Sequence, residues 1–127
     1  MAYVYDDQNI FAKILRAEIP NTTVYETEHT LAFRDIAPKA PDHVLVIPKG
    51  PYVTFDHFCQ AASDEELTDF FRASGEVCKM IGAAADDTAL GFRAITNAGQ
   101  HGVQEVPHFH LHILSGRPLG RMVEATD

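Results

Sequence analysis

The chain has 127 residues and a mass of 14.0 kDa, which is the size of one domain. Hydrophobic residues make up 46% of it and charged residues 22%, values that exclude a disordered or collagen-like protein. No apolar run approaches the ~20 residues that cross a bilayer, so we expect no membrane partner. The formal net charge of −8 argues against nucleic acid as a partner, because binding its backbone requires Lys and Arg at the phosphates.

The first residues and the cysteines bear on the cellular compartment. Residues 1–7 have neither the basic start nor the apolar stretch of a secretory signal peptide. Cys59 and Cys78 form no zinc motif and no disulfide framework, and we expect two reduced thiols. These features predict a cytoplasmic protein.

Apolar periodicity and turn residues predict two helices and five strands. In chain order these are a short helix at 9–17, a hairpin of strands at 22–26 and 30–35, a strand at 43–48, an irregular stretch at 49–62, a long helix at 63–81, and strands at 91–97 and 107–115. The best-marked boundary is Ser63-Asp64-Glu65-Glu66, a capping box at the start of the long helix. Because the strands do not alternate regularly with helices, we predict an α+β fold with a mainly antiparallel five-stranded sheet.

The segment His108-Phe109-His110-Leu111-His112-Ile113-Leu114 carries three histidines at alternate positions. Alternate residues of a strand share a face, so the imidazoles are expected on one face and the apolar side chains on the other. The apolar face can pack on the long helix. Three titratable rings in a row are a poor fit to isolated structural histidines and indicate a functional site.

Two chemistries compete for this row of histidines. Neighbouring histidines can share a zinc ion, with His43 as a ligand from another strand, but the first and third Cα atoms lie about 13 Å apart on an extended strand. Nucleophilic catalysis fits better, because a neutral imidazole can attack phosphorus through one nitrogen while the other donates to a carbonyl. We therefore expect His110 to be the nucleophile, His112 a phosphate contact, and His108 a supporting residue.

Residues 97–105 lie directly before this row and include two glycines. Such a loop can turn several backbone N–H groups toward an anion, and Asn97 and Gln104 add amide donors. The sequence therefore predicts a phosphate-binding loop next to the histidines.

Taken together, these motifs resemble the histidine triad (HIT) superfamily of nucleotidyl hydrolases and transferases, in particular its Hint branch. The resemblance extends from Asn9 to about Arg117 and rests on the segments 10–14, 31–38, 41–49 and 97–117. It implies a single HIT domain over 1–127, with a motif-bearing core at about 9–117 and a tail at 118–127. It also implies a HIT-like fold whose sheets join edge to edge in a homodimer.

The resemblance implies a role for each matching position. The catalytic candidates are His110, His112, His43 and His108, with a transient nucleotidyl group on His110. Asp35 matches the acidic residue that accepts hydrogen bonds from the ribose hydroxyls. The remaining nucleotide-binding candidates are Ile36, Asn97, Val103, Gln104, Glu105, Phe11, Ile14, Phe33 and Leu45.

The implied activity is that of an enzyme without a cofactor. It would cleave the bond to the α-phosphate of purine nucleoside 5′-phosphoramidates or aminoacyl adenylates and release the nucleoside monophosphate. The alternatives are a dinucleoside polyphosphate hydrolase, and a nucleotide-binding interaction protein whose catalysis is incidental.

The sequence departs from the family pattern at two places. Val103 occupies the place of a glycine in the Hint branch, and Asn9 and Ala12 replace the cysteines of a zinc site in some relatives. No metal is therefore expected.

Overall fold

A computed structural model describes residues 3–123 of the chain. Three helices and five strands follow one another in the order α1 (Ile10–Leu15), β1 (Thr23–Glu26), β2 (Thr30–Arg34), β3 (Asp42–Pro48), α2 (Phe55–Ala61), α3 (Asp64–Met80), β4 (Arg93–Ile95) and β5 (Leu111–Ser115). Within these residues, no helix has the length and apolar character that crossing a membrane requires.

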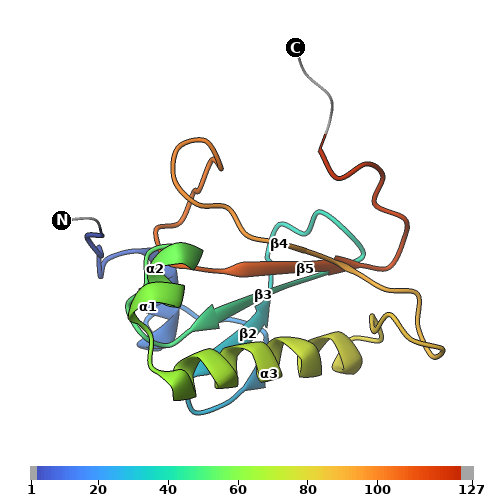
Figure 1. Ribbon diagram of the computed structural model, residues 1–127, viewed down its shortest axis with the longest axis horizontal. Coiled ribbons are helices and arrows are strands. Elements are labelled where there is room, and N and C mark those ends of the chain that lie inside the picture. Colours follow the sequence, from blue (N-terminus) through green and yellow to red (C-terminus); the bar gives the residue numbers. More distant parts are fainter. Residues whose placement is uncertain (1–2, 124–127) are drawn as a thin grey trace.

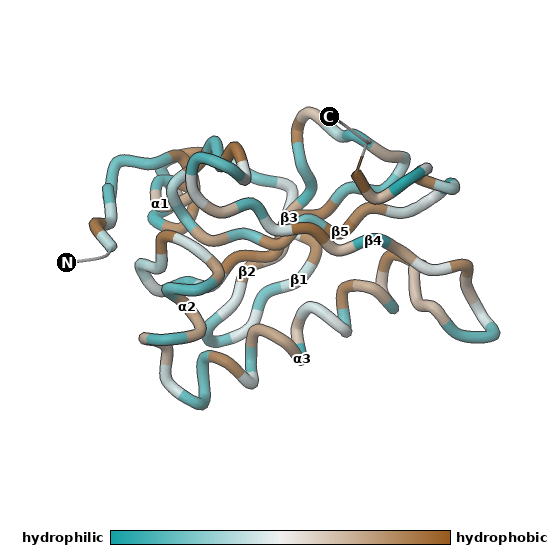
Figure 2. The backbone as a smooth tube through the Cα atoms, turned by 45° about the horizontal axis from the view of Figure 1, so that its top comes forward, coloured by the Kyte–Doolittle hydropathy of each residue, from teal (hydrophilic) through white to brown (hydrophobic). Residues whose placement is uncertain are grey.

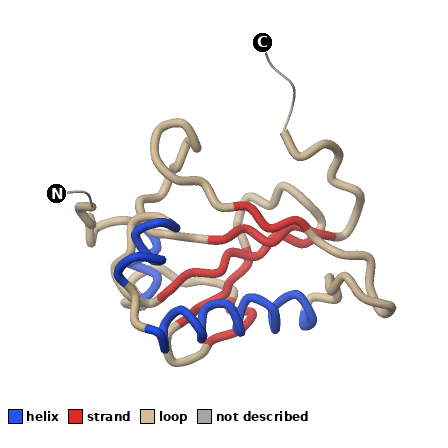
Figure 3. The backbone as a smooth tube through the Cα atoms, viewed as in Figure 1, coloured by secondary structure: helices blue, strands red, loops and turns tan. Residues whose placement is uncertain are grey.

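The strands form one antiparallel sheet in the order β1-β2-β3-β5-β4 (Figure 1). The chain leaves β3, passes through α2 and α3, reaches the edge at β4, and returns through a long loop to insert β5 between β3 and β4 (Figure 3). This arrangement confirms the predicted α+β class and the mainly antiparallel five-stranded sheet. It also places β3 and β5 side by side at the centre, with Leu45 opposite His112.

The two faces of the sheet bury different side chains. Val44, Val46 and Ile113 pack against Phe70 and Val77 of α3, together with Phe109 just before β5. As predicted, the apolar side of the histidine row faces the long helix. The opposite face is covered at one end by α1 and contains Phe11, Ile14, Leu31, Phe33, Leu45 and Ile47. In Figure 2, the hydrophobic colouring accordingly concentrates on the central strands.

Helix α3 begins as its sequence predicts. The Ser63 side chain accepts from the Glu66 backbone N–H, and the Glu66 side chain accepts from the Ser63 backbone N–H, which completes the capping box. Three carboxylates in the first turn also suit the positive end of the helix. The helix is thereby fixed at the end where it leaves α2.

The sequence predicts an irregular stretch at 49–62, and this prediction is wrong: the stretch contains helix α2. The Thr54 side chain caps this helix by accepting from the His57 backbone N–H, and Phe58 anchors it in the core. A helix of seven residues with one buried side chain has too little periodicity to stand out in sequence. The fold therefore has two short helices and one long helix.

Several predicted elements are also shorter than expected. The first helix ends at Leu15, because Ala17 takes a left-handed conformation with φ of 61°. Strand β5 begins at Leu111 and not at residue 107, because the backbone before it bonds elsewhere: Phe109 N–H donates to the Tyr52 carbonyl, and the His110 carbonyl accepts from the Thr96 hydroxyl. Strand β4 is reduced to Arg93–Ile95 opposite β5.

Candidate active site

A cavity of about 610 Å³ opens on the face of the sheet that carries α1. Twelve of the fourteen predicted site residues line it: His43, His110, His112, Asp35, Ile36, Asn97, Val103, Glu105, Phe11, Ile14, Phe33 and Leu45. His108 and Gln104 lie outside its wall. The topology explains the clustering, because β3 and β5 are neighbours and turn His43 and His112 to the same side.

His110 is buried at the inner wall of the cavity, with 6% of its surface exposed. Its Nδ1 lies 2.7 Å from the His108 carbonyl oxygen. A carbonyl only accepts, so this contact places the proton on Nδ1 and leaves the lone pair on Nε2. Burial lowers the pKa of His110, so the ring is neutral near pH 7. His110 thus has the tautomer that a nitrogen nucleophile requires.

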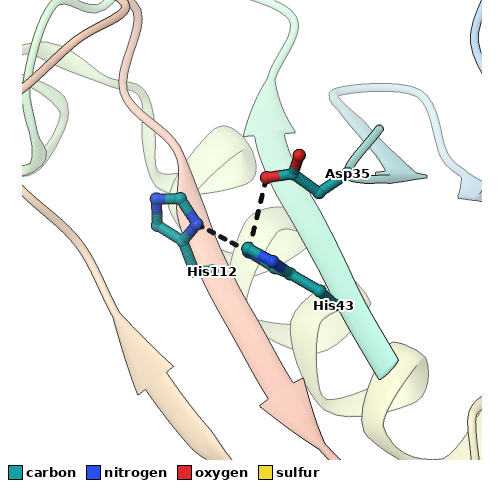
Figure 4. Close-up of side chains that lie close together, drawn as sticks. All are labelled: Asp35, His43 and His112. Carbon is teal, nitrogen blue, oxygen red and sulfur yellow. Dashed lines mark hydrogen bonds and ion pairs between the residues drawn. The ribbon is translucent and has the colours of Figure 1, made fainter. Parts of the chain in front are cut away.

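His112 has the opposite tautomer, which a chain of hydrogen bonds determines. The Lys39 backbone N–H donates to Nδ1 of His43 at 3.0 Å, so the proton of neutral His43 is on Nε2. The Nε2–H of His43 donates to Nδ1 of His112 at 2.9 Å (Figure 4). An Asp35 oxygen also lies 3.5 Å from Nε2 of His43. His112 is therefore left with its own N–H on Nε2. Burial, with His110 and His43 as neighbours, lowers the pKa of His112 to about 4, so the ring is a neutral donor.

His108 is fully buried behind the other two histidines. Its Nε2–H donates to the Pro48 carbonyl at 2.8 Å, and the Tyr5 hydroxyl donates to its Nδ1 at 2.7 Å. Burial lowers its pKa to about 4. His108 contacts the site through its backbone carbonyl, in line with the expected supporting position. The contribution of Tyr5 has no signal in the sequence, because it bonds to a residue 103 positions away.

The trio Asp35, His43 and His112 offers three ligand atoms within 4.8 Å of one another, a spacing that could hold a metal ion. A bound ion would need the lone pair of His43 Nε2, but the Lys39 N–H occupies Nδ1 and keeps the proton on Nε2. Metal-bound histidines normally donate through the nitrogen that does not bind the ion, whereas His43 accepts there. The hydrogen bonds therefore favour a chain of neutral, hydrogen-bonded rings over a zinc site.

The position at which some relatives carry a zinc cysteine has another structural use here. The Asn9 side-chain oxygen accepts from the Phe11 and Ala12 backbone N–H groups, both at 2.9 Å, and caps α1. Capping α1 holds Phe11 in place, and the Phe11 ring lies edge-on to His110 with centroids 4.9 Å apart. Asn9 thus supports the wall of the cavity.

The apolar end of the cavity is formed by Phe11, Ile14, Phe33 and Leu45, which pack together beneath α1. Ile36 is 95% exposed and stands at the rim. Asp35 also lines the cavity: one of its oxygens accepts from the Ala37 backbone N–H at 2.8 Å, and the other lies 3.5 Å from Nε2 of His43. Apolar side chains and the carboxylate of Asp35 therefore line this part of the cavity.

The loop 97–105 contributes Asn97, Val103 and Glu105 to the wall of the cavity. Gly102 is required there, because a Cβ atom would lie 2.7 Å from backbone atoms of Ala98. The sequence predicts that Gln104 donates to a phosphate, but its side chain does not line the cavity. Its amide oxygen accepts from the Gly99 N–H, and its amide nitrogen donates to the Val53 and Val106 carbonyls. Its role here is to brace the loop.

Val103 has φ of 54°, a left-handed conformation that glycine adopts without strain and a β-branched residue rarely adopts. The backbone thus takes the glycine-type conformation although the side chain does not suit it. Because Val103 is 72% exposed, Val103→Gly would lose little burial. We expect Val103→Gly to raise the free energy of unfolding by about 0.5–1.5 kcal/mol, measured by urea denaturation. Val103→Ala, which keeps the Cβ atom, is the matched control, and a destabilised glycine variant would contradict the strain.

The buried histidines make stability depend on pH in a defined direction. His43, His108, His110 and His112 all have pKa values lowered by burial, whereas unfolded histidine titrates near 6.5. Below about pH 6.5 the unfolded chain therefore binds more protons than the folded one. The contribution of these histidines to the free energy of unfolding is complete above that pH and is lost as the pH drops toward 4. The loss at His108 alone amounts to about 3 kcal/mol at pH 4.

We expect the melting temperature to fall already between pH 6.5 and 5, above the range in which ordinary carboxylates titrate. Thermal melts of the wild type and of His112→Gln test this, because the variant removes one of the four groups and should show a shallower slope. The exposed His101→Gln is the control and should retain the wild-type slope. A flat profile in this window would contradict the burial argument.

The HIT domain profile matches residues 16–119, and the chain therefore belongs to the HIT family. A HIT-like protein from Azospirillum brasilense is 52% identical over 97% of this chain and 98% of its own length. The purine nucleoside phosphoramidase of Escherichia coli K12 is 40% identical over 92% of this chain and 94% of its own length. A HIT family hydrolase from Clostridium thermocellum has a similar structure, with a TM-score of 0.78, 34% identity, and coverage of 94% of this chain and 99% of that one. These likenesses confirm the predicted family and its fold.

Proposed function

We propose that this HIT family hydrolase cleaves purine nucleoside 5′-phosphoramidates or aminoacyl adenylates through a nucleotidyl intermediate on His110. The observation that carries the proposal is the hydrogen bond from Nδ1–H of His110 to the His108 carbonyl. It directs the lone pair of Nε2 away from that carbonyl in a ring that lines the cavity. The 40% identity to a protein named purine nucleoside phosphoramidase supports the same class of substrate.

The reaction proceeds by two displacements at the α-phosphorus. Nε2 of His110 attacks phosphorus, the bond from phosphorus to the leaving nitrogen or acyl oxygen breaks, and an amine leaving group takes a proton from water. Water then attacks phosphorus, loses a proton, and displaces the imidazole, so that nucleoside monophosphate and free His110 remain. The Nε2–H of His112 donates to a phosphoryl oxygen as charge develops there. No step requires a metal or a cofactor.

The rest of the cavity holds the nucleotide in this proposal. Phe11, Ile14, Phe33 and Leu45 contact the purine, with Ile36 covering it from the rim. Asp35 accepts from the ribose hydroxyls, and Asn97 with the backbone of residues 97–105 contacts the phosphate. The partner is a small purine nucleotide and neither nucleic acid nor membrane, and we place the activity in the cytoplasm.

A panel of adenosine substrates tests the proposal with the purified full-length protein. Adenosine 5′-phosphoramidate and an aminoacyl adenylate should be turned over with a larger kcat/KM than diadenosine polyphosphate. Preference for the polyphosphate would assign the alternative hydrolase activity. Binding of adenosine monophosphate without turnover of any substrate would assign a nucleotide-binding interaction protein instead.

We also propose that two copies join through β4, which is an edge of the sheet and, within residues 3–123, pairs only with β5. Leu90 and Phe92, just before this strand, are large hydrophobic side chains left exposed. An unpaired edge next to exposed apolar side chains is an aggregation hazard that pairing with a second copy removes.

We therefore expect light scattering after size exclusion to give about twice 14.0 kDa at micromolar concentration. Phe92→Glu places a charge beside the edge and should shift the protein toward the monomer. Val4→Glu, at another exposed hydrophobic position, is the control and should leave the mass unchanged. A monomeric wild type would contradict the pairing.

A further inference from the structure

Glu105 places a carboxylate in the wall of the cavity that also contains His110. The residue is exposed, and within residues 3–123 its carboxylate forms no hydrogen bond or ion pair with another side chain. Its negative charge acts on His110, whose pKa it tends to raise against the larger effect of burial. A charged group with no structural partner, close to the nucleophile, is available to contact a ligand.

The other charged residues that line the cavity are Arg34, Asp35 and Lys39. Arg34 pairs with Asp42 at 3.2 Å, and the Lys39 ammonium donates to the Ala37 carbonyl at 2.8 Å. Both basic side chains are thus bonded within the protein, and Asp35 is assigned to the ribose. Glu105 is the charged residue of the cavity wall that has neither a partner within residues 3–123 nor a role in holding the nucleoside.

The reacting atoms lie within reach of this charge. In the proposed reaction the α-phosphorus bonds to Nε2 of His110 as the bond to the leaving group breaks, so the leaving group is attached to the atom that His110 attacks. A charge in the cavity wall that acts on His110 therefore also acts on the leaving group. A carboxylate there attracts a positive charge and repels a negative one.

We infer that Glu105 selects the leaving group by charge and favours amines that carry a further cationic group over neutral or anionic ones. This inference rests on the proposed phosphoramidate hydrolysis and adds the chemical class of the leaving group. It also predicts poor use of dinucleoside polyphosphates, whose leaving groups are polyanions. Because Glu105 is solvent-exposed, the selectivity is about three- to tenfold per charge at low salt and shrinks as salt is added.

Three adenosine 5′-phosphoramidates of equal chain length test the inference. Their leaving amines are 1,3-diaminopropane, propylamine and 3-aminopropanoate, which end in an ammonium, a methyl group and a carboxylate. For the wild type we expect kcat/KM to rank the ammonium substrate first and the carboxylate substrate last. Glu105→Gln should bring the ratio of these two substrates close to one, and Glu105→Lys should reverse it. Asp87→Asn removes the same charge from an exposed position away from the cavity and should keep the wild-type ratio.

The ratio separates this inference from the function on which it rests. If none of the three substrates is hydrolysed, the proposed function fails. If all are hydrolysed and the ratio is the same in wild type, Glu105→Gln and Glu105→Lys, the activity stands and the role of Glu105 is wrong. A ratio that changes equally in Asp87→Asn would assign the effect to net charge and would also overturn the inference.

Discussion

His110→Ala is expected to reduce turnover of a phosphoramidate by about four orders of magnitude or more. Covalent catalysis depends on one nitrogen, and neither neighbouring histidine can replace it: His108 has both ring nitrogens bonded, and Nδ1 of His112 accepts from His43. The nucleotide should still bind, because Asp35 and the apolar end of the cavity are unchanged. The expected result is a large loss in kcat with a change in monophosphate affinity of about tenfold or less.

The sequence places His110 on an open face, but the structure buries it against Phe11 and the His108 carbonyl. The alanine variant therefore also loses stability, by about 1–3 kcal/mol, because it leaves a buried carbonyl without its donor. His110→Asn is the matched control, since its amide can donate to the same carbonyl but offers no nucleophilic lone pair. If both variants lose turnover equally while His110→Asn is the more stable, the loss of activity is due to the missing nucleophile and not to unfolding.

The intermediate itself provides a direct measurement. Protein quenched in base during turnover of a substrate labelled at the α-phosphate should carry acid-labile label, and His110→Ala should carry none. His112→Ala should retain some label and lose less activity, because it removes one contact to the developing charge, worth about 2–4 kcal/mol. Label that persists in His110→Ala and disappears in His112→Ala or His108→Ala would show that another histidine is the nucleophile.

Local patterns in the sequence were sufficient where the structure depends on local geometry. The capping box predicts the start of α3, and the alternation after His108 predicts which side chains reach the helix and which do not. The β-branched run at 43–48 likewise predicts the strand that carries His43, whereas its pairing with β5 is seen only in the structure.

The features that the sequence could not predict depend on contacts between distant backbone atoms. The proton positions of the histidines follow from the Pro48 and His108 carbonyls and the Lys39 N–H. These are backbone groups, so the residue types do not reveal which histidine nitrogen they contact. Gln104 shows the same limit: an amide in a phosphate loop can face the ligand or brace the loop, and only the positions of Val53 and Val106 decide between them. The tautomers, more than the residues themselves, distinguish a nucleophile from a donor.

The second large effect is expected at Asp35, which lines the cavity next to His43. One carboxylate oxygen is already partly used by the Ala37 N–H, and the other lies 3.5 Å from Nε2 of His43. Both oxygens keep lone pairs for further donors, because an ionised carboxylate can accept about four hydrogen bonds. A ribose diol supplies two such donors.

Asp35→Ala should therefore lower kcat/KM for a ribonucleoside phosphoramidate by about 30- to 150-fold, which corresponds to about 2–3 kcal/mol for two hydrogen bonds to a charged acceptor after water is replaced. The same variant should lose about threefold or less with the 2′,3′-dideoxy substrate, which has no diol to bind. Asp35→Asn keeps the size of the side chain and removes its charge, so it should fall between wild type and alanine with the ribonucleoside. Equal losses for both sugars would mean that Asp35 acts through His43 and His112, to which it is linked by the 3.5 Å contact, and would remove the ribose from its role.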